Sequence, residues 1–326
     1  MTINKTLLTT TLILLISFVL LVGFSFNTEE PQRFDSIQEP FNLSYQIKPL
    51  DIPESVFFAG EKVPIESFDV LESLDKELLI NTYWQSQTLL FIKRANRFFP
   101  IIEAIFEQEG VPADFKYLAL VESGLTNVVS PSDAAGYWQF LKGTAQDYKL
   151  EVNDEIDERY HIEKSTEAAA KFLKDSYEKF GNWAMAAASY NTGRRSLSRQ
   201  IERQKSNKYY DLTLGEETGR YVYRLIALKL ILESPEKYGF FVEKDQMYPE
   251  IPFKNIKVDS TVHDWADFAH SQGINYKTLK ELNPWLRDNT LTNNSNKTYQ
   301  IKIPTGKHRT IDPNPEFYPE DSLLRK

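Results

Sequence analysis

Apolar residues recur with the period of an α-helix through residues 66–240, and this feature limits most what the chain can fold into. Side chains three or four positions apart share one face of a helix, whereas a strand with one buried face alternates with period two. Little of this region alternates with period two. The sequence therefore predicts a predominantly α-helical main domain, which we place at residues 65–245 together with an N-terminal helical extension.

Glycine, proline and capping residues mark where these helices begin and end. Gly110, followed closely by a proline, ends one long helix and prepares the next. Ser165 is the expected cap of a helix that ends at Gly181. A last helix, from 216 to 233, stops at Ser234 before a proline. With 326 residues, 41% of them hydrophobic, the chain is long and apolar enough for a second folded domain.

A smaller domain is expected at residues 253–305. Both of its ends alternate like strands, and two short helical stretches lie between them, near 262–272 and 276–282. This pattern predicts a small α+β module with the order β-α-α-β. The remaining residues, 306–326, are expected to form a C-terminal tail.

The N-terminus begins with an apolar run. Residues 7–26 carry no charged side chain, and a helix of this length spans roughly the 30 Å of a bilayer's hydrocarbon core. Small residues near Gly23 also suit a signal-peptide cleavage site. Residues 1–26 are therefore expected to be a signal peptide or a membrane anchor, and the rest of the chain to be exported. Residues 27–64 contain several prolines and are expected to form an extended linker.

The lack of cysteine and the negative charge disfavour several classes of protein. Without cysteine, the exported part has no disulfides and no lipid-accepting thiol after the apolar run. The formal net charge of -8 disfavours nucleic acid or anionic lipid as the main partner. The histidines lack a clustered third ligand, so no metal site is expected. Basic residues at 194–208 are interpreted as a solvated helix face, with anionic peptides or lactyl groups as alternative ligands.

Glu122 places a carboxyl group on the apolar face of a short predicted helix. Phe115, Leu118 and Leu125 share that face. Burial without a neighbouring cation raises the pKa of a carboxyl group, and a rise from about 4.3 to about 6 takes roughly 2.3 kcal/mol. Glu122 is therefore a candidate general acid. The alternative is a structural glutamate satisfied by a helix N-terminus or an arginine.

Four short motifs follow one another between residues 122 and 222. They are Glu122-Ser123-Gly124, then Ser130-Pro-Ser-Asp133-Ala-Ala-Gly136-Tyr137-Trp138-Gln139-Phe140, then Ser189-Tyr190-Asn191-Thr192-Gly193, and finally Glu217-Thr218-Gly-Arg-Tyr221-Val222. Together they resemble the signature of the goose-lysozyme-like lytic transglycosylases, the SLT-domain enzymes of glycoside hydrolase family twenty-three. The arrangement is most similar to that of the membrane-bound murein transglycosylases of the D type.

Two departures from the family pattern lie in the second motif. Tyr137 and Trp138 replace the usual Leu-Met before Gln139, and their aromatic rings are expected either to stack on sugars or to fill core. Asp133 stands where glycine is common, at a position expected to need a positive φ, which Asp tolerates better than most residues.

The resemblance implies a lysozyme-like α-helical domain that cleaves the β-1,4 bond between N-acetylmuramic acid and N-acetylglucosamine in peptidoglycan. In this family the C6 hydroxyl of N-acetylmuramic acid attacks C1, so one protein carboxyl group suffices and the product ends in a 1,6-anhydro sugar. Glu122 would first protonate the leaving oxygen and then accept the hydroxyl proton. No cofactor is expected. The expected partner is the glycan strand of peptidoglycan, in the cell envelope (periplasm).

The same resemblance implies a set of substrate-binding side chains. They are Ser123, Ser130, Tyr137, Trp138, Gln139, Tyr190, Asn191 and Tyr221. Besides Tyr137 and Trp138, which could instead fill core, three more have a structural alternative: Ser123 as a loop cap, Tyr190 as a core aromatic, and Asn191 as part of a helix C-cap. The resemblance therefore assigns a site, while the residues alone leave these roles open.

The 253–305 module resembles a divergent LysM domain, whose relatives bind glycans that contain N-acetylglucosamine. The resemblance rests on motifs that include Leu282-Asn283-Pro284-Trp285 and Ile301-Lys-Ile303-Pro304. The alternative is a small packing domain that has kept the fold.

Two other functions remain open for the main domain. A hydrolytic muramidase would need a second carboxylate, such as Asp133 or Asp147, within about 9 Å of Glu122. A non-catalytic peptidoglycan-binding protein of the envelope would keep the cleft but need no buried acid.

Overall fold

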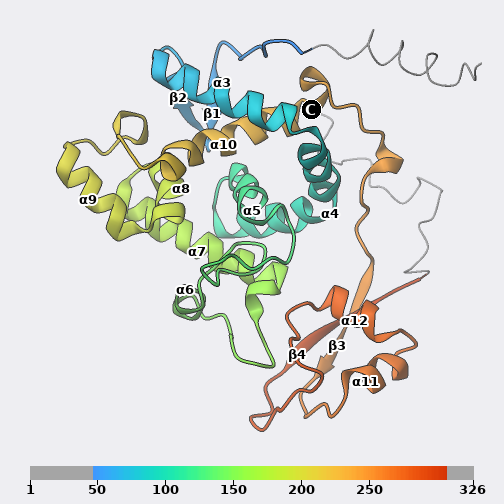
Figure 1. Cartoon of the computed structure of the whole chain (residues 1–326). Coiled ribbons are helices and arrows are strands. Elements are labelled where there is room, and N and C mark those ends of the chain that lie inside the picture. Colours follow the sequence, from blue (N-terminus) through green and yellow to red (C-terminus); the bar gives the residue numbers. More distant parts are fainter. Residues whose placement is uncertain (1–46, 307–326) are drawn as a thin grey trace, which may run out of the picture. The chain divides into compact units, whose positions relative to one another are not determined.

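The computed structural model describes residues 47–306 (Figure 1). Almost all of these residues belong to one compact unit that begins at Leu50. The expected signal peptide or anchor at 1–26 lies outside the described residues, as does the expected tail beyond residue 306. Within the described part, no helix is both long enough and apolar enough to cross a membrane.

The main domain is α-helical, as the sequence predicts. Its helices are α3 (Phe68–Tyr83), α4 (Gln85–Glu109), α5 (Lys116–Ser123), α6 (Lys142–Asp147), α7 (Ile162–Phe180), α8 (Trp183–Thr192), α9 (Arg194–Gln204) and α10 (Glu216–Glu233). Short 3-10 turns lie between them at Ala113–Phe115, Glu158–Tyr160, Tyr209–Asp211, Pro235–Tyr238 and Lys244–Gln246.

Most of the expected helix ends are confirmed. Gly110 and Gly181 end α4 and α7 with φ of +70° and +78°, a left-handed conformation that glycine adopts without a Cβ clash. Ser234 ends α10. The expectation for Ser165 is wrong, because α7 begins three residues earlier and Ser165 lies inside its first turn. There its hydroxyl donates to the carbonyl of His161, 2.8 Å away.

The core of the domain forms around α5. Figure 1 shows α5 at the centre of the helices, with α4 and α10 packed against it. Residues 117–120 are at most 1% exposed, so this short helix is buried on nearly all sides. Residues 184–189 of the alanine-rich helix α8 are buried as well, because their small side chains let neighbouring backbones approach closely.

A β-hairpin occupies the end of the expected linker. Strands β1 (Val56–Phe58) and β2 (Glu61–Val63) pair antiparallel across a turn at Ala59 and Gly60, both at positive φ. Val56, Phe58 and Val63 are buried in the core of the main domain. The expected linker at 27–64 is therefore corrected at residues 56–63, where the apolar residues pack as a hairpin instead of continuing an extended chain. Its part at 27–46 lies outside the described residues.

The C-terminal module has the predicted β-α-α-β order. Strands β3 (Phe253–Val258) and β4 (Tyr299–Pro304) pair antiparallel, with helices α11 (Trp265–Ser271) and α12 (Tyr276–Leu282) between them. Asp264 and Asn275 cap the two helices through their side chains. Trp265, Leu279 and Ile301 are fully buried at the centre of the module.

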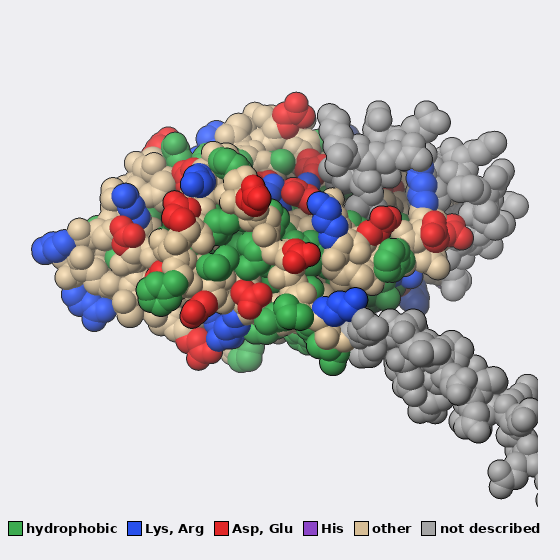
Figure 2. Space-filling model, turned by 90° about the horizontal axis from the view of Figure 1, so that it is seen from above, with side chains coloured by type: hydrophobic (Ala, Val, Ile, Leu, Met, Phe, Trp, Pro, Cys, Tyr) green, Lys and Arg blue, Asp and Glu red, His purple; other side chains and the backbone are tan. Residues whose placement is uncertain are grey.

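The surface mixes charges of both signs. On the face in Figure 2, acidic and basic side chains alternate around a group of hydrophobic ones. Exposed hydrophobic side chains on α3 and the turn after it include those of Phe68, Leu71, Ile80 and Trp84. No single sign of charge therefore dominates the face that this view shows.

Candidate active site

Glu122 lies in the last turn of α5, immediately before a tight turn. Gly124 ends the helix at φ +59°, and a Cβ at this position would lie 2.9 Å from the ring of Phe91. Arg94 donates to the carbonyl of Gly124 at 3.1 Å. The end of α5 is thus held by close packing that leaves no room for a larger residue, and this fixes the backbone beside Glu122.

The environment of Glu122 favours its neutral form. The pKa of Glu122 is raised to about 7; desolvation is the largest cause, and the nearby Glu217 carboxylate acts in the same direction. The hydroxyl of Tyr221 donates a hydrogen bond to Oε1 of Glu122 and acts in the opposite direction, as does the charge of Arg224. In the described part of the chain, no ion pair joins Glu122 to an arginine or lysine. The raised pKa expected from the sequence is therefore present, and the arginine-paired alternative is not.

Ser123 connects α5 to the motif that follows it. Its hydroxyl is buried and lies 2.8 Å from the carbonyl oxygen of Tyr137 and 3.0 Å from that of Ala119. A hydroxyl engaged by two backbone carbonyls orients the chain rather than a sugar. This geometry supports the structural alternative for Ser123, with its role in the site being to position the second motif.

The second motif folds as a compact loop, residues 128–140, which we call the catalytic loop. Ala135 forms antiparallel β-bridges with Val129 and with Phe140, so the loop folds back and pairs with itself. Asp133 has φ +61°, as its place in the motif predicts. Gln139 also has a positive φ, +48°, a less common conformation for a side chain with a Cβ.

Ser130 and Gln139 are engaged within the catalytic loop. The Ser130 hydroxyl accepts from the backbone N–H of Ala134 at 3.1 Å. The side-chain amide nitrogen of Gln139 donates to the carbonyls of Val128 and Gly136 at 3.0 and 2.9 Å. Both side chains therefore shape the loop. Their expected contacts with substrate remain predictions.

Tyr137 and Trp138 do not present their rings to a cleft, which corrects their expected role as stacking surfaces. Trp138 is 0% exposed, packs on Phe106, and donates its indole N–H to Thr166 at 2.9 Å. Tyr137 is 6% exposed and its ring lies against Phe98. The two side chains fill core space between α4 and α7, which was the alternative interpretation of these two aromatic residues.

Tyr221 is also buried, at 2% exposed, and its hydroxyl contacts the carboxyl group of Glu122. It reaches Glu122 from α10, so the fourth motif contributes a partner of the acid. The structure therefore places Tyr221 beside the candidate acid, and its expected contact with substrate remains a prediction.

Tyr190 and Asn191 bring the end of α8 to the same region. The Tyr190 hydroxyl donates to the carbonyl of Trp138 at 2.7 Å. Asn191 donates to Glu217 at 3.3 Å and accepts from Thr218 at 2.7 Å, which joins α8 to α10. Asn191 is not the C-cap of α8, because Gly193 takes that place. Glu217 and Thr218 therefore belong to the candidate site. They are part of the fourth sequence motif, but the sequence alone suggested no role for them.

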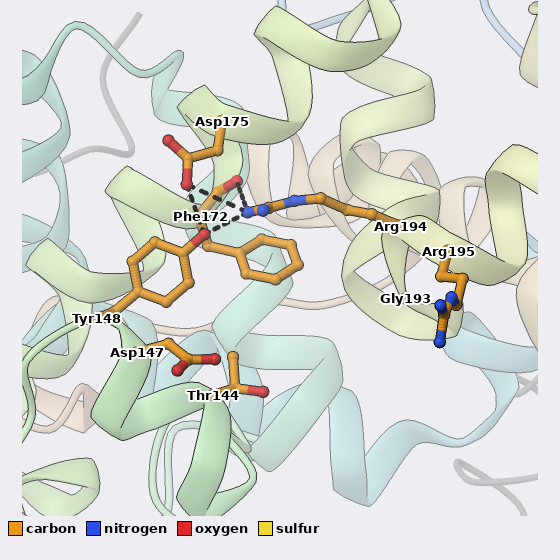
Figure 3. A pocket seen from close by; sticks show the side chains of 8 residues that line it. All are labelled: Thr144, Asp147, Tyr148, Phe172, Asp175, Gly193, Arg194 and Arg195. Atoms are coloured by element: carbon orange, nitrogen blue, oxygen red, sulfur yellow. Dashed lines mark hydrogen bonds and ion pairs between the residues drawn. The ribbon is translucent and has the colours of Figure 1, made fainter.

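A pocket of about 500 Å³ lies where α6, α7 and α9 meet, and Figure 3 shows its lining. Asp147 lines it, whereas Glu122 does not. Arg194, from the expected basic cluster, donates to Tyr148, to the carbonyl of Phe172 and to Ser176. Arg194 is therefore bound within the fold. Arg195 is exposed and lies apart from these contacts.

Comparisons with known proteins agree with this geometry. Residues 99–213 match the family model of the transglycosylase SLT domain, and residues 254–307 match that of the soluble lytic transglycosylase C-terminal LysM-like domain. The chain is 26% identical over 299 residues to the membrane-bound lytic murein transglycosylase D of Escherichia coli K12, and equally to that of E. coli O6:H1. The match covers 85% of this chain and 65% of each relative, just under two thirds of the relatives' length. Residues 99–213, which include Glu122, are therefore similar to a transglycosylase SLT domain, and residues 254–307 are similar to a LysM-like domain.

Proposed function

We propose that this protein is a peptidoglycan lytic transglycosylase. It cleaves the β-1,4 bond between N-acetylmuramic acid and N-acetylglucosamine and leaves 1,6-anhydro ends. The observation that carries the proposal is the state of Glu122, a partly buried carboxyl group with a pKa raised to about 7 that accepts the hydroxyl of Tyr221. The SLT domain and the names of the murein transglycosylase relatives support the same assignment.

A carboxyl group with this pKa suits both halves of the reaction. Near pH 7 the protonated and ionised forms of Glu122 are both populated, so the same group serves as acid and then as base. In the first half, Glu122 gives its proton to the glycosidic oxygen as the bond from C1 to that oxygen breaks. In the second, the C6 hydroxyl of the muramic acid bonds to C1 and its proton passes to Glu122. The acid is regenerated, and no water is consumed.

Tyr221 directs the proton to one of the two oxygens of the Glu122 carboxyl group. Its hydroxyl donates to Oε1, so Oε1 acts as an acceptor and Oε2 is left to carry the proton. The same hydrogen bond stabilises the carboxylate that remains after the first transfer. Tyr221 therefore both orients the carboxyl group of Glu122 and influences which of its oxygens carries the proton.

A hydrolytic muramidase is the second candidate, because another carboxyl group lies near the acid. Glu217 is close enough to raise the pKa of Glu122 by charge repulsion. It is exposed and bound to Asn191. In a muramidase, Glu217 would activate a water molecule on the far side of the sugar. In a transglycosylase, replacing Glu217 by Gln lowers the pKa of Glu122 but leaves the product unchanged.

The envelope is the expected compartment, and its finer details are part of the proposal. The relatives are membrane-bound by name, and we propose that this chain acts in the periplasm with residues 1–26 as its anchor or its cleaved signal. Fractionation of cells that express the full chain tests this. A membrane-associated chain that begins at residue 1 identifies an anchor, and a shortened chain in the periplasmic fraction identifies a signal peptide.

Purified sacculi provide the test of function. Wild-type protein should clear a sacculus suspension, and Glu122→Gln should pellet with sacculi without clearing them, because an amide keeps the shape but loses the transferable proton. A wild-type protein that pellets with sacculi and never clears them is a binding protein, which contradicts the proposal. Full clearing by Glu122→Gln contradicts the assignment of the acid.

A further inference from the structure

The LysM-like module shares its core with the SLT domain. Trp285 and Leu286 of the module belong to one buried hydrophobic cluster with Ala135, Ile156 and Tyr160 of the catalytic domain. Such a continuous apolar cluster is typical of parts that fold against each other, rather than of a module on a flexible tether.

Backbone hydrogen bonds reinforce this contact. Ile156 and Leu286 form an antiparallel β-bridge. Beside them, the N–H of Asp157 donates to the carbonyl of Trp285 at 2.9 Å, and the N–H of Arg287 donates to that of Glu155 at 2.8 Å. We call residues 151–163 of the catalytic domain the docking segment. Its backbone is paired with the loop that follows α12.

Side chains along the docking segment also bind the module. The carboxylate of Glu155 accepts from the N–H and the hydroxyl of Thr292 at 2.8 and 2.9 Å. Two more carboxylates of the segment, those of Glu151 and Glu163, pair with Lys297 and Lys302. The module therefore holds the docking segment at several points along its length.

The docking segment in turn holds the catalytic loop through Arg159. The guanidinium group forms a largely buried ion pair with Asp157 at 2.7 Å. Its third nitrogen, Nη1, donates to the carbonyls of Asp133 and Phe140 at 2.8 and 3.1 Å. One arginine thus binds two separated points of the catalytic loop and the residue whose backbone is paired with the module.

Gly136 brings the two segments into direct contact. A Cβ at this position would lie 1.9 Å from the carbonyl oxygen of Arg159, so the catalytic loop rests on the backbone of the docking segment. The next residue, Tyr137, accepts the hydroxyl of Ser123, which neighbours Glu122. The contacts are therefore continuous from the module to the end of the helix that carries the acid.

We propose that the LysM-like module positions the catalytic loop for the reaction, and that Arg159 is the positioning residue through which it acts. This rests on the proposed function for its kinetic readout. Two other roles make different predictions. A glycan tether affects KM for sacculi, and a simple stabiliser affects the fraction of folded protein but leaves the kcat of each folded molecule unchanged.

A double-mutant cycle in the full chain tests the proposal. Glu155→Lys disrupts the module side of the docking segment, and Arg159→Lys keeps the charge but loses the planar group that reaches Asp157, Asp133 and Phe140 together. Each should lower kcat about tenfold with little change in KM, and the double variant should be no worse than the more impaired single one. Lys277→Ala, which removes an exposed ion pair within the module, is the matched control and should retain wild-type kinetics.

Three outcomes overturn the proposal: a raised KM with normal kcat, effects of the two variants that multiply, or kcat values equal to wild type. Hydrogen exchange gives a second readout that needs no activity. In both variants the amide of Ala135, which bonds Phe140 within the catalytic loop, should exchange faster while amides of α3 stay protected. Unchanged exchange in the loop contradicts the proposal even if the protein proves not to be a transglycosylase, whereas an inactive wild type with faster loop exchange in the variants contradicts only the proposed function.

Discussion

Replacing Glu122 by Gln should stabilise the folded protein at pH 8. Desolvation raises the pKa of Glu122 to about 7, above its reference value of 4.5. Between these two values the folded state keeps a proton that the unfolded state has released. The stabilising contribution of protonated Glu122 to the free energy of unfolding is therefore fully present below pH 4.5. It is lost as the pH rises through 7, where Glu122 ionises in the folded state.

The size of the effect follows from the two pKa values. Each pH unit corresponds to 1.36 kcal/mol, so ionised Glu122 lowers the free energy of unfolding by about 3 kcal/mol above pH 7. Because the side chain is only partly buried, screening by water makes this an upper limit. Gln carries no charge at any pH. It should gain up to about 3 kcal/mol over the wild type at pH 8, and nothing from this source at pH 4.

Urea unfolding at pH 4 and pH 8, followed by tryptophan fluorescence, measures this difference. Comparing the two pH values cancels any constant effect of the amide. Glu167→Gln, on the exposed side of α7, is the matched control and should change the free energy of unfolding by less than about 0.5 kcal/mol at both values. An equal effect of Glu122→Gln at pH 4 and pH 8 would refute the argument that desolvation sets the pKa of this group.

Three further variants test particular contacts. Tyr221→Phe removes the hydrogen bond that lowers the pKa of Glu122, so the alkaline limb of the pH profile of kcat should move to higher pH; a limb that stays in place contradicts the assignment. Gly136→Ala drives a Cβ into the backbone of Arg159 at φ +78° and should cost about 3 kcal/mol or more in urea unfolding, whereas a cost below about 1 kcal/mol shows that the loop yields. Glu61→Ala removes the carboxylate that accepts two N–H groups at the start of α8, and thermal melting should show a loss of about 1 kcal/mol; an unchanged melting temperature excludes that capping role.

The sequence predicts the helices best where backbone chemistry decides locally. Gly110 and Gly181 end their helices because left-handed φ values favour glycine, and this preference can be recognised from the sequence alone. The hairpin at 56–63 is missed because its strands have three residues each, too few to show alternation. Ser165 fails as a cap because His161 begins the helix one turn earlier, without a side-chain capping bond.

For the site, the sequence identifies the acid but not its surroundings. The apolar surroundings of Glu122 on its own helix can be predicted from the sequence, since they depend on residues three or four positions away. Tyr221 reaches the carboxyl from a helix far along the chain, and the sequence alone does not say which residues the fold brings there. The same limit applies to Trp138, because a core position and a sugar-binding position both favour an aromatic residue.

The mass of the new glycan ends formed in water enriched in oxygen-18 shows which nucleophile attacks C1. If the muramic acid's own C6 hydroxyl attacks, the ends are lighter than hydrolytic ends by one water molecule and contain no heavy oxygen, and Glu122→Gln releases none of them. New reducing ends that carry oxygen-18 would show that water attacks, and would contradict the account.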